Sequence, residues 1–381
     1  MCDAPSVIRV SAWGMEMRIY FYSLAHSGRG GMESVLKIVV SELLRNGYDV
    51  TSIFTQPSYV DTSWMSELGN VVYSERKAHG LGPRFEGENI LVSSILDLQS
   101  VLRKLPKPDV IVAMTPSATA IARAAIGVFG SDAPLLISWV HFNLGALPDR
   151  TLIGYADAHL AISTGILNQI RQLDPAKPVK LTFNPVHTRN VQPIPRASEP
   201  TFVYVGRLDM AQKRFDVLLQ ALSRLRHYDW RLRVVGDVVL DSDDTKVTIE
   251  TLVKELKLVD RIDWMGWQTS PWAVVESASA LVLTSDWEGF PLVMVEALAR
   301  GIPVISSNCP TGPADIVLPG VNGWLFEPGN VEQLSSILDG ILNGSTELPE
   351  PGVCTSAVEK FDTSLVVREM AAAIEHYCMH L

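Results

Sequence analysis

The sequence predicts an α/β chain made of two doubly wound, Rossmann-like domains that face a central cleft. Two observations support this prediction. Short β-rich runs alternate with apolar patterns of helical spacing, and the alternation restarts after a proline-rich break. Strands that alternate with helices indicate parallel sheets covered on both faces, and the nearly continuous apolar strands fit such burial.

The first series of predicted strands lies in the N-terminal half of the chain. Its members are RIYFYS (18–23), DVIVAM (109–114), LLISWV (135–140) and AHLAIS (158–163). Apolar residues recur at helical spacing from Met32 to Leu44 and from Ala118 to Val128, which predicts helices between these strands.

The break between the two series is NPVHTRNVQPIPRASEP (184–200), which contains four prolines and shows no periodicity. Such a stretch is typical of an interdomain linker, and we place the linker at 187–200. The second series follows it with TFVYVG (201–206), RLRVVG (231–236), RIDWMG (261–266), ALVLTS (280–285) and PVISS (303–307).

These patterns divide the chain into an extension (1–17), an N-terminal domain (18–186), the linker, a C-terminal domain (201–360) and a last helix (361–381). That helix is amphipathic and opens with a plausible cap at Asp362, Thr363 and Ser364. We expect it to return to the N-terminal domain.

Composition narrows the class of protein. The 381 residues are 47% hydrophobic and 19% charged, and no apolar segment approaches the roughly 20 residues of a membrane span. Residues 1–17 lack the basic region and apolar run of a signal peptide, so we expect no export. The four cysteines lie far apart without metal-ligand spacing, which favours reduced thiols in a cytoplasm.

The net charge of -10 argues against nucleic acid as a partner. Residues 18–190 hold 16 basic and 14 acidic side chains, whereas residues 191–381 hold 15 and 26. This asymmetry suggests two domains with different partners, although drift of surface charge would also produce it.

The stretch SDWEGFPLVMVEALARG (285–301) places two carboxylates around the start of one helix. Pro291 suits a first helical turn, and Gly301 suits the end of a helix over 292–300. The N-terminus of that helix favours a phosphate, and Glu296, about a turn deeper, can accept hydrogen bonds from ribose hydroxyls. Glu288, in the loop, would hold the group that is attached to the phosphates on the side away from the ribose. The alternative is a helix cap plus an exposed glutamate.

A second charged loop, VGRLDMAQKR (205–214), follows the first strand of the second series. Arg207 and Lys213 flank it before a helix that begins near Phe215. Two cations at the carboxyl edge of a sheet can neutralise a diphosphate. Arg214 either serves beside Lys213 or is solvated.

Three further stretches are weaker signals. HSGRGGMES (26–34) has neither the dinucleotide fingerprint nor the P-loop ending, but Gly30 and Gly31 would let backbone N–H groups approach a ligand, unless they only form a tight turn. His141 follows a buried strand and is either a cleft residue or a structural one. DSDD (241–244) resembles a metal motif, but a solvated loop is the better interpretation.

Together these residues resemble the retaining family 4 (group 1) glycosyltransferases of the GT-B fold. The E-x7-E signature corresponds to Glu288 and Glu296, the phosphate-binding pair to Arg207 and Lys213, the glycine loop to Gly30, Gly31 and Glu33, and the family histidine to His141. Within that family the chain resembles the bacterial lipopolysaccharide core 1,6-galactosyltransferases, on stretches such as SWVHFNL, YADAHLAISTGI and DRIDWMGWQTSPW.

The resemblance implies two groups of site residues. The catalytic group comprises His141, Arg207, Lys213 and Glu288. The donor-binding group comprises Gly30, Gly31, Arg207, Lys213, Met265, Gly289, Phe290, Pro291, Leu292 and Glu296. Glu296 would hold ribose, Met265 would border the uracil, and His141 would lie near the anomeric carbon. No metal or other cofactor is needed if the cations and the helix N-terminus take the electrostatic role.

The implied reaction is transfer of galactose from UDP-galactose to a lipopolysaccharide core sugar, with retention at the anomeric carbon. The N-terminal domain would bind the acceptor and the C-terminal domain the UDP-sugar, at the cytoplasmic face of the inner membrane. The alternatives are a UDP-glucose or UDP-N-acetylglucosamine transferase acting on another glycan or glycolipid, a UDP-sugar epimerase, and a non-catalytic UDP-sugar-binding module. An NAD enzyme is disfavoured because the glycine fingerprint is missing.

Overall fold

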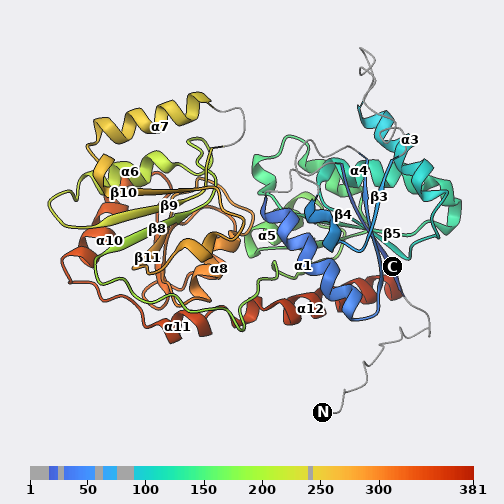
Figure 1. Ribbon diagram of the computed structural model, residues 1–381. Helices are drawn as coiled ribbons and strands as arrows, with labels where there is room; N and C mark the ends of the chain where they lie inside the picture. Colours follow the sequence, from blue (N-terminus) through green and yellow to red (C-terminus); the bar gives the residue numbers. More distant parts are fainter. Residues whose placement is uncertain (1–16, 25–29, 56–62, 75–89, 239–242) are drawn as a thin grey trace. The chain divides into compact units, whose positions relative to one another are not determined.

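The computed structural model describes residues 17–24, 30–55, 63–74, 90–238 and 243–381, which form two compact units (Figure 1). The first unit consists of the described residues up to Pro185 together with Thr363–Leu381, and the second is Val186–Asp362. The predicted linker belongs to the second unit, since Ile194 N donates to Arg300 O and Arg196 Nη1 donates to Ser279 O.

In the described part of the first unit, seven parallel strands form one sheet in the order β3-β2-β1-β4-β5-β6-β7. The strands are β1 (Arg18–Ser23), β2 (Asp49–Phe54), β3 (Asn70–Tyr73), β4 (Val110–Ala113), β5 (Leu135–Val140), β6 (Ala158–Ala161) and β7 (Val179–Leu181). The order of strands reverses between β1 and β4, where Ile19 pairs with Val110.

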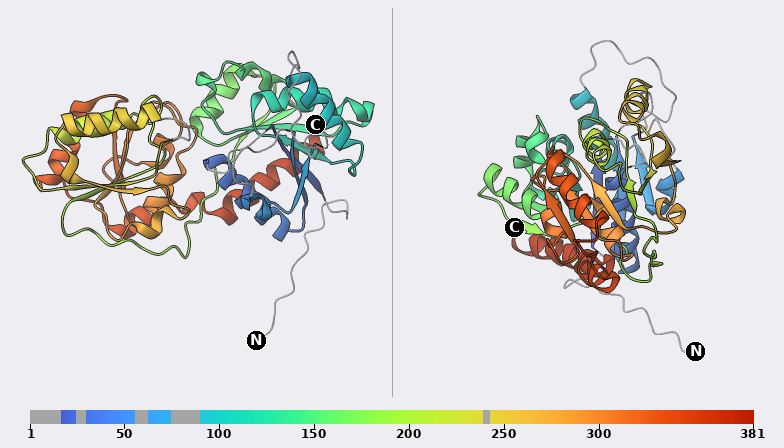
Figure 2. Two further views of the ribbon diagram at one scale, coloured as in Figure 1. Left: turned by 45° about the horizontal axis from the view of Figure 1, so that its top comes forward. Right: turned by 90° about the vertical axis from the view of Figure 1, so that its left-hand side faces the viewer.

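Helices cover both faces of this sheet (Figures 1 and 2). They are α1 (Gly31–Arg45), α3 (Ile90–Leu102), α4 (Pro116–Ala125), α5 (Thr164–Leu173) and α12 (Thr363–His380). The Thr115 and Ser163 hydroxyls cap α4 and α5 by accepting from Ala118 N and Ile166 N. Tyr20 and Tyr22 of β1 pack in the core with Leu98 of α3.

The predicted return of the last helix to the N-terminal domain is confirmed. Helix α12 packs against α1 within the first unit (Figure 1). The Tyr48 hydroxyl donates to Glu375 Oε1 at 2.6 Å, and the Tyr377 hydroxyl donates to His159 O.

The described residues of the second unit form a six-stranded parallel sheet in the order β10-β9-β8-β11-β12-β13. The strands are β8 (Thr201–Val205), β9 (Arg231–Val235), β10 (Ile262–Gly266), β11 (Ala280–Leu283), β12 (Val304–Ser307) and β13 (Gly323–Phe326). Here the order reverses between β8 and β11, where Phe202 pairs with Ala280.

The second unit carries helices α6 (Phe215–Ser223), α7 (Asp243–Glu255), α8 (Leu292–Leu298), α9 (Pro313–Ile316), α10 (Val331–Leu342) and α11 (Pro351–Ser356). Helix α6 packs against α7 and α10, whereas α8 packs against α11. Short 3-10 helices lie at Ser63–Glu67, Ile126–Asp132, Leu144–Ala146, Arg150–Tyr155, Val259–Arg261, Pro271–Val274 and Glu359–Phe361.

Every predicted strand is present, with ends that differ by at most two residues. The sequence analysis did not identify β2, β3, β7 or β13. Asp243 and Asp244 open α7 instead of lying in a solvated loop, while residues 241–242 lie outside the described part. None of the helices that the structure describes has the length and apolarity needed to cross a bilayer.

Candidate functional site

The two charged loops of the second unit follow β8 and β11, the neighbouring strands between which the strand order reverses. This position is the topological switch point of the sheet. Strands β8 and β11 are neighbours, and the chain runs from them toward opposite ends of the sheet. The loop with Arg207 and Lys213 follows β8, and the loop with Glu288 follows β11. Ligands of open α/β sheets bind outside the carboxyl ends of strands at such a point.

The basic loop is shaped by a local turn. Asp209 Oδ1 accepts hydrogen bonds from the backbone N–H groups of Ala211 and Gln212, at 2.6 and 2.8 Å. Arg207 is exposed, and its Nη2 donates to Gln212 Oε1 at 3.0 Å. Gln212 in turn donates through Nε2 to Trp287 O in the acidic loop. The turn therefore holds the Arg207 guanidinium beside the residue that precedes Lys213.

Lys213 and Glu288 meet although 75 residues separate them in the chain. Lys213 Nζ lies 2.6 Å from Glu288 Oε1, and both side chains are largely buried. Ser285 Oγ donates to the same carboxylate oxygen at 2.6 Å, and Thr311 Oγ1 donates to the Glu288 carbonyl. The pairing brings the basic loop and the acidic loop into contact.

The buried carboxylate of Glu288 affects its neighbours. Burial raises the pKa of the Cys309 thiol to about 12, and the negative charge of Glu288 contributes to the same shift. Burial likewise raises the pKa of Tyr204, with Glu288 as the next cause. Cys309 is therefore a neutral thiol at physiological pH, which makes it a poor nucleophile.

Arg214, which the sequence left as either a partner of Lys213 or a solvated residue, is only partly exposed. Its guanidinium forms ion pairs with Asp216 at 3.1 Å and with Asp286 at 2.9 Å. Hydrogen bonds from Arg214 to these two carboxylates raise the pKa of the guanidinium, with Asp216 the larger cause.

Helix α8 starts at Leu292, as predicted. Pro291 is its N-cap residue rather than part of the first turn, and the helix ends at Leu298, before the turn that closes at Gly301. Gly312, at φ +97°, lies against this start, since a Cβ there would be 2.5 Å from Pro291 Cδ and 3.2 Å from Gly289 O. Phe290 is buried and packs edge-on against Phe361.

The carboxylate of Glu296 is oriented by a tryptophan. Trp272 Nε1 donates to Glu296 Oε2 at 2.7 Å. The Arg300 guanidinium lies over the Trp272 ring at 5.0 Å and donates to Glu296 O. Glu296 is thus a fixed, half-buried acceptor one turn into α8, beside the first helical residue Leu292.

Met265 lies on the edge strand β10, two strands away from β8. It is the bulged residue between Trp264 and Gly266, and its carbonyl accepts from Gln268 Nε2. Its proposed contact with uracil therefore remains a prediction.

The predicted residues of the first unit share the carboxyl edge of its sheet. Gly30 and Gly31 begin α1, and residues 26–29 of the same motif lie outside the described part. A Cβ at Gly30 would lie 2.5 Å from Glu33 Oε2, so glycine there makes room for that carboxylate. His141 follows β5, is 7% exposed, and packs edge-on against Trp139 with ring centroids 4.2 Å apart.

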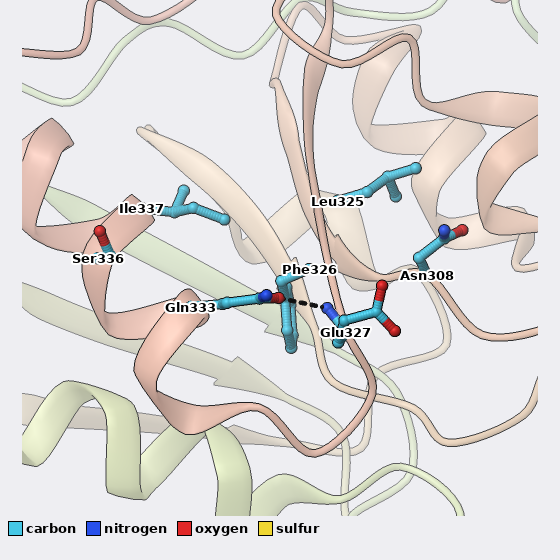
Figure 3. A pocket seen from close by; sticks show the side chains of 7 residues that line it. All are labelled: Asn308, Leu325, Phe326, Glu327, Gln333, Ser336 and Ile337. Atoms are coloured by element: carbon cyan, nitrogen blue, oxygen red, sulfur yellow. Dashed lines mark hydrogen bonds between the residues drawn. The ribbon is translucent and has the colours of Figure 1, made fainter.

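The sequence analysis missed Gln212, Asp286, Trp272 and Thr311 as partners of the predicted residues. The acid at Asp286, two residues before Glu288, was a usable signal, because it faces the basic loop once β8 and β11 are neighbours. A pocket of about 370 Å³ lies elsewhere, lined by Asn308, Leu325, Phe326, Glu327, Gln333, Ser336 and Ile337 (Figure 3). Its lining contains none of the predicted site residues.

Comparison with known proteins identifies the family. The chain is 34% identical over 356 residues to a lipopolysaccharide 1,6-galactosyltransferase of Escherichia coli (strain K12), covering 91% of this chain and 95% of that protein. The chain belongs to the group 1 glycosyltransferases. The family described as "Glycosyl transferases group 1" matches residues 188–351, and a lipopolysaccharide 1,6-galactosyltransferase of Salmonella typhimurium is 32% identical over 94% of this chain and 98% of its own length.

Solved structures agree with this assignment. The lipopolysaccharide outer core galactosyltransferase WaaB in its apo form superposes with a TM-score of 0.78 and 30% identity, over 94% of this chain and 99% of that one. Anabaena HepE, in complex with UDP and glucose, has a TM-score of 0.76 but only 19% identity over 94% of this chain and 99% of its own, so it shows the fold alone. The predicted GT-B fold is confirmed, as is the resemblance to the 1,6-galactosyltransferases.

Proposed function

We propose that this group 1 glycosyltransferase transfers galactose from UDP-galactose to a sugar of the lipopolysaccharide core, with retention at the anomeric carbon. The identity to two lipopolysaccharide 1,6-galactosyltransferases over more than nine tenths of the chain supports the donor and the acceptor. The observation that carries the catalytic part is the meeting of Lys213 and Glu288 at the switch point of the second unit.

In this proposal Arg207 and Lys213 bind the diphosphate of the donor. Charge builds on the leaving phosphate as its bond to the sugar loosens, and fixed cations stabilise that charge most in the transition state. An ammonium has three N–H donors, so Lys213 can keep its pair with Glu288 and still donate to a phosphate oxygen. The exposed guanidinium of Arg207 offers a planar fork for the same group.

Glu296 accepts from the ribose hydroxyls, and the loop from Glu288 to Leu292 positions the sugar. The Trp272 indole presets the Glu296 carboxylate for that role. Met265, also in the second unit, borders the uracil. The resemblance to the family assigns further donor contacts to the amides of Gly30 and Gly31 and to the His141 ring in the first unit. No metal enters this scheme, because the two cations supply the positive charge.

A donor and acceptor assay tests the proposal. The chain is incubated with UDP-galactose, UDP-glucose or UDP-N-acetylglucosamine and a truncated core oligosaccharide, and products are read by mass and by anomeric proton coupling. We expect one added hexose from UDP-galactose, joined by an α linkage. Transfer only from another donor favours the glucose or N-acetylglucosamine alternative, and UDP binding without transfer favours a binding module.

We further propose that the enzyme works in the cytoplasm, at the inner membrane surface, through its N-terminal half. That half is nearly neutral, whereas anionic lipid would repel the acidic C-terminal half. Arg103 and Lys104 are exposed at the end of α3. Replacing both with Glu is expected to reduce co-sedimentation with vesicles containing anionic lipid, while Lys254→Glu in the second unit leaves it unchanged. Equal losses from both changes would contradict this assignment.

A further inference from the structure

The residue after Lys213 has an unusual backbone. Arg214 sits at the N-cap of α6 with φ 48° and ψ 48°, in the left-handed region that side chains other than glycine rarely adopt. Such a conformation is strained and persists only where surrounding contacts enforce it. The contacts of Arg214 therefore have to compensate for its backbone.

The side chain supplies those contacts. Arg214 Nε and Nη2 donate to the two carboxylate oxygens of Asp216, at 3.1 and 3.2 Å, which is a bidentate pair within the start of α6. The remaining arm, Nη1, donates to Asp286 Oδ2 at 2.9 Å. The guanidinium thus joins the basic loop and its helix to the acidic loop that carries Glu288.

The backbones of the two loops are joined as well. The buried hydroxyl of Thr284 lies 2.8 Å from both the Lys213 and the Arg214 carbonyl oxygens. The Asp286 N–H donates to Gln212 O at 2.8 Å. The peptide groups on either side of the Lys213 side chain are therefore fixed to the loop of Glu288.

We propose that Arg214 and Asp286 are positioning residues that hold Lys213 in place for the donor diphosphate. The inference rests on the proposed function of Lys213. A free lysine side chain has much rotamer entropy to lose on binding. Fixing its backbone and its Glu288 partner beforehand removes part of that cost, which is how a supporting shell preorganises a site.

The left-handed backbone offers a discriminating variant. Arg214→Gly keeps a residue that tolerates this conformation, so a loss of UDP binding reports the missing guanidinium and not a distorted backbone. Asp286→Asn removes the negative charge that pairs with Arg214 Nη1. Arg214→Lys keeps a positive charge, but an ammonium cannot make the bidentate pair with Asp216 and reach Asp286 as well. Arg224→Gly is the matched control, because Arg224 lies at the other end of α6 in an exposed pair with Glu332.

The test measures UDP binding by calorimetry, together with kcat and the donor KM, on the full chain. We expect Arg214→Gly and Asp286→Asn each to weaken UDP binding by about tenfold and to raise the donor KM, since misplacing a positioned group costs up to about a hundredfold. The double variant should lose little more than either single one. Arg214→Lys should recover part of the loss, and Arg224→Gly should bind UDP as the wild type does.

Two results would overturn the inference. If Arg214→Gly lowers the melting temperature but binds UDP and turns over like the wild type, the ion pair only stabilises the fold. If the two single effects add fully in the double variant, Arg214 and Asp286 do not act together. Failure of the proposed function looks different, because Lys213→Ala itself would then leave UDP binding unchanged.

Discussion

Among single residues, the proposed donor site depends on two side chains that were predicted separately and lie in contact. Lys213 and Glu288 form a largely buried pair at 2.6 Å. Breaking such a pair leaves an uncompensated charge, so each partner is expected to matter for more than its own contact with a ligand.

We predict that Lys213→Ala lowers kcat at least a hundredfold while the protein stays folded. Removing one group that stabilises developing charge typically costs about 3–4 kcal/mol of transition-state stabilisation. The comparison is Lys37→Ala, because Lys37 forms a more exposed pair with Glu67 in the first unit. Steady-state kinetics measures kcat, and circular dichroism shows whether the variant is folded. A rate near that of the wild type would contradict the proposed site.

Trp272→Phe should raise the donor KM by about tenfold, because it removes the N–H that orients Glu296 and a hydrogen bond to a charged group is worth about 1.5–3 kcal/mol. The ring under Arg300 is kept. Trp230→Phe is a matched control, since Trp230 Nε1 donates to Leu225 O and is not part of the site. Equal KM values for both variants would show that Glu296 does not depend on Trp272.

At the scale of elements, a buried polar chain ties β5, β6 and the end of α5 together. Ser138 Oγ lies 2.6 Å from His159 Nδ1, and His159 Nε2 lies 3.2 Å from Asp174 Oδ2. Lys177 Nζ lies 3.7 Å from the same carboxylate oxygen. Ser138 and His159 have no exposed surface, so the arrangement is structural although its residue types resemble a catalytic triad.

Because of the buried His159 in this series of polar contacts, we predict that the stability of the protein depends on pH. Burial lowers the pKa of His159 below its ordinary value of 6.5, against the opposing effect of Asp174. The unfolded chain therefore binds a proton more readily, and this contribution to stability is full above pH 6.5 and is lost as the pH falls below it. The melting temperature should fall from pH 7 to pH 5, and less so in His159→Gln. An identical slope in both proteins would contradict this.

Elements with strong patterns were predictable, and those without them were not. Strands β1, β5, β8 and β11 are runs of buried apolar residues, which the sequence shows directly. Edge strands β3 and β7 are short and partly exposed, so they carry no clear alternation. Strand β13 begins at Gly323, where a Cβ would lie 2.0 Å from Val304 O, so its first residue carries no apolar side chain that could signal a strand.

The charged residues of the candidate site could be predicted from the sequence, but the residues that hydrogen-bond to them and hold them in place could not. Arg207, Lys213, Glu288 and Glu296 follow from loop position and residue type. The contacts of Gln212, Arg214 and Trp272 join residues 75, 72 and 24 positions apart in the chain. Only the neighbouring positions of β8 and β11 in the sheet bring the first two contacts about.

In the molecule as a whole, the residues proposed for the donor lie in both units. The second unit holds the cations and carboxylates proposed for the donor, and the first holds the Gly30 loop and His141. The difference in charge between the two halves of the chain accompanies this division.

The cation-based scheme predicts that catalysis does not require a divalent metal. Because Arg207 and Lys213 supply the positive charge, EDTA should leave kcat within about twofold of its untreated value, and added Mg²⁺ or Mn²⁺ should not raise it by more. Initial rates with UDP-galactose and the core oligosaccharide measure this. Loss of activity in EDTA that Mn²⁺ restores would reassign the charge stabilisation to a metal.

A crystal structure of the full chain soaked with UDP would test directly whether Arg207 and Lys213 bind the donor diphosphate. We expect the diphosphate at the carboxyl edge of β8 and β11, with its oxygens within hydrogen-bonding distance of Arg207 and Lys213. UDP bound elsewhere, with both side chains directed to solvent, would contradict this expectation.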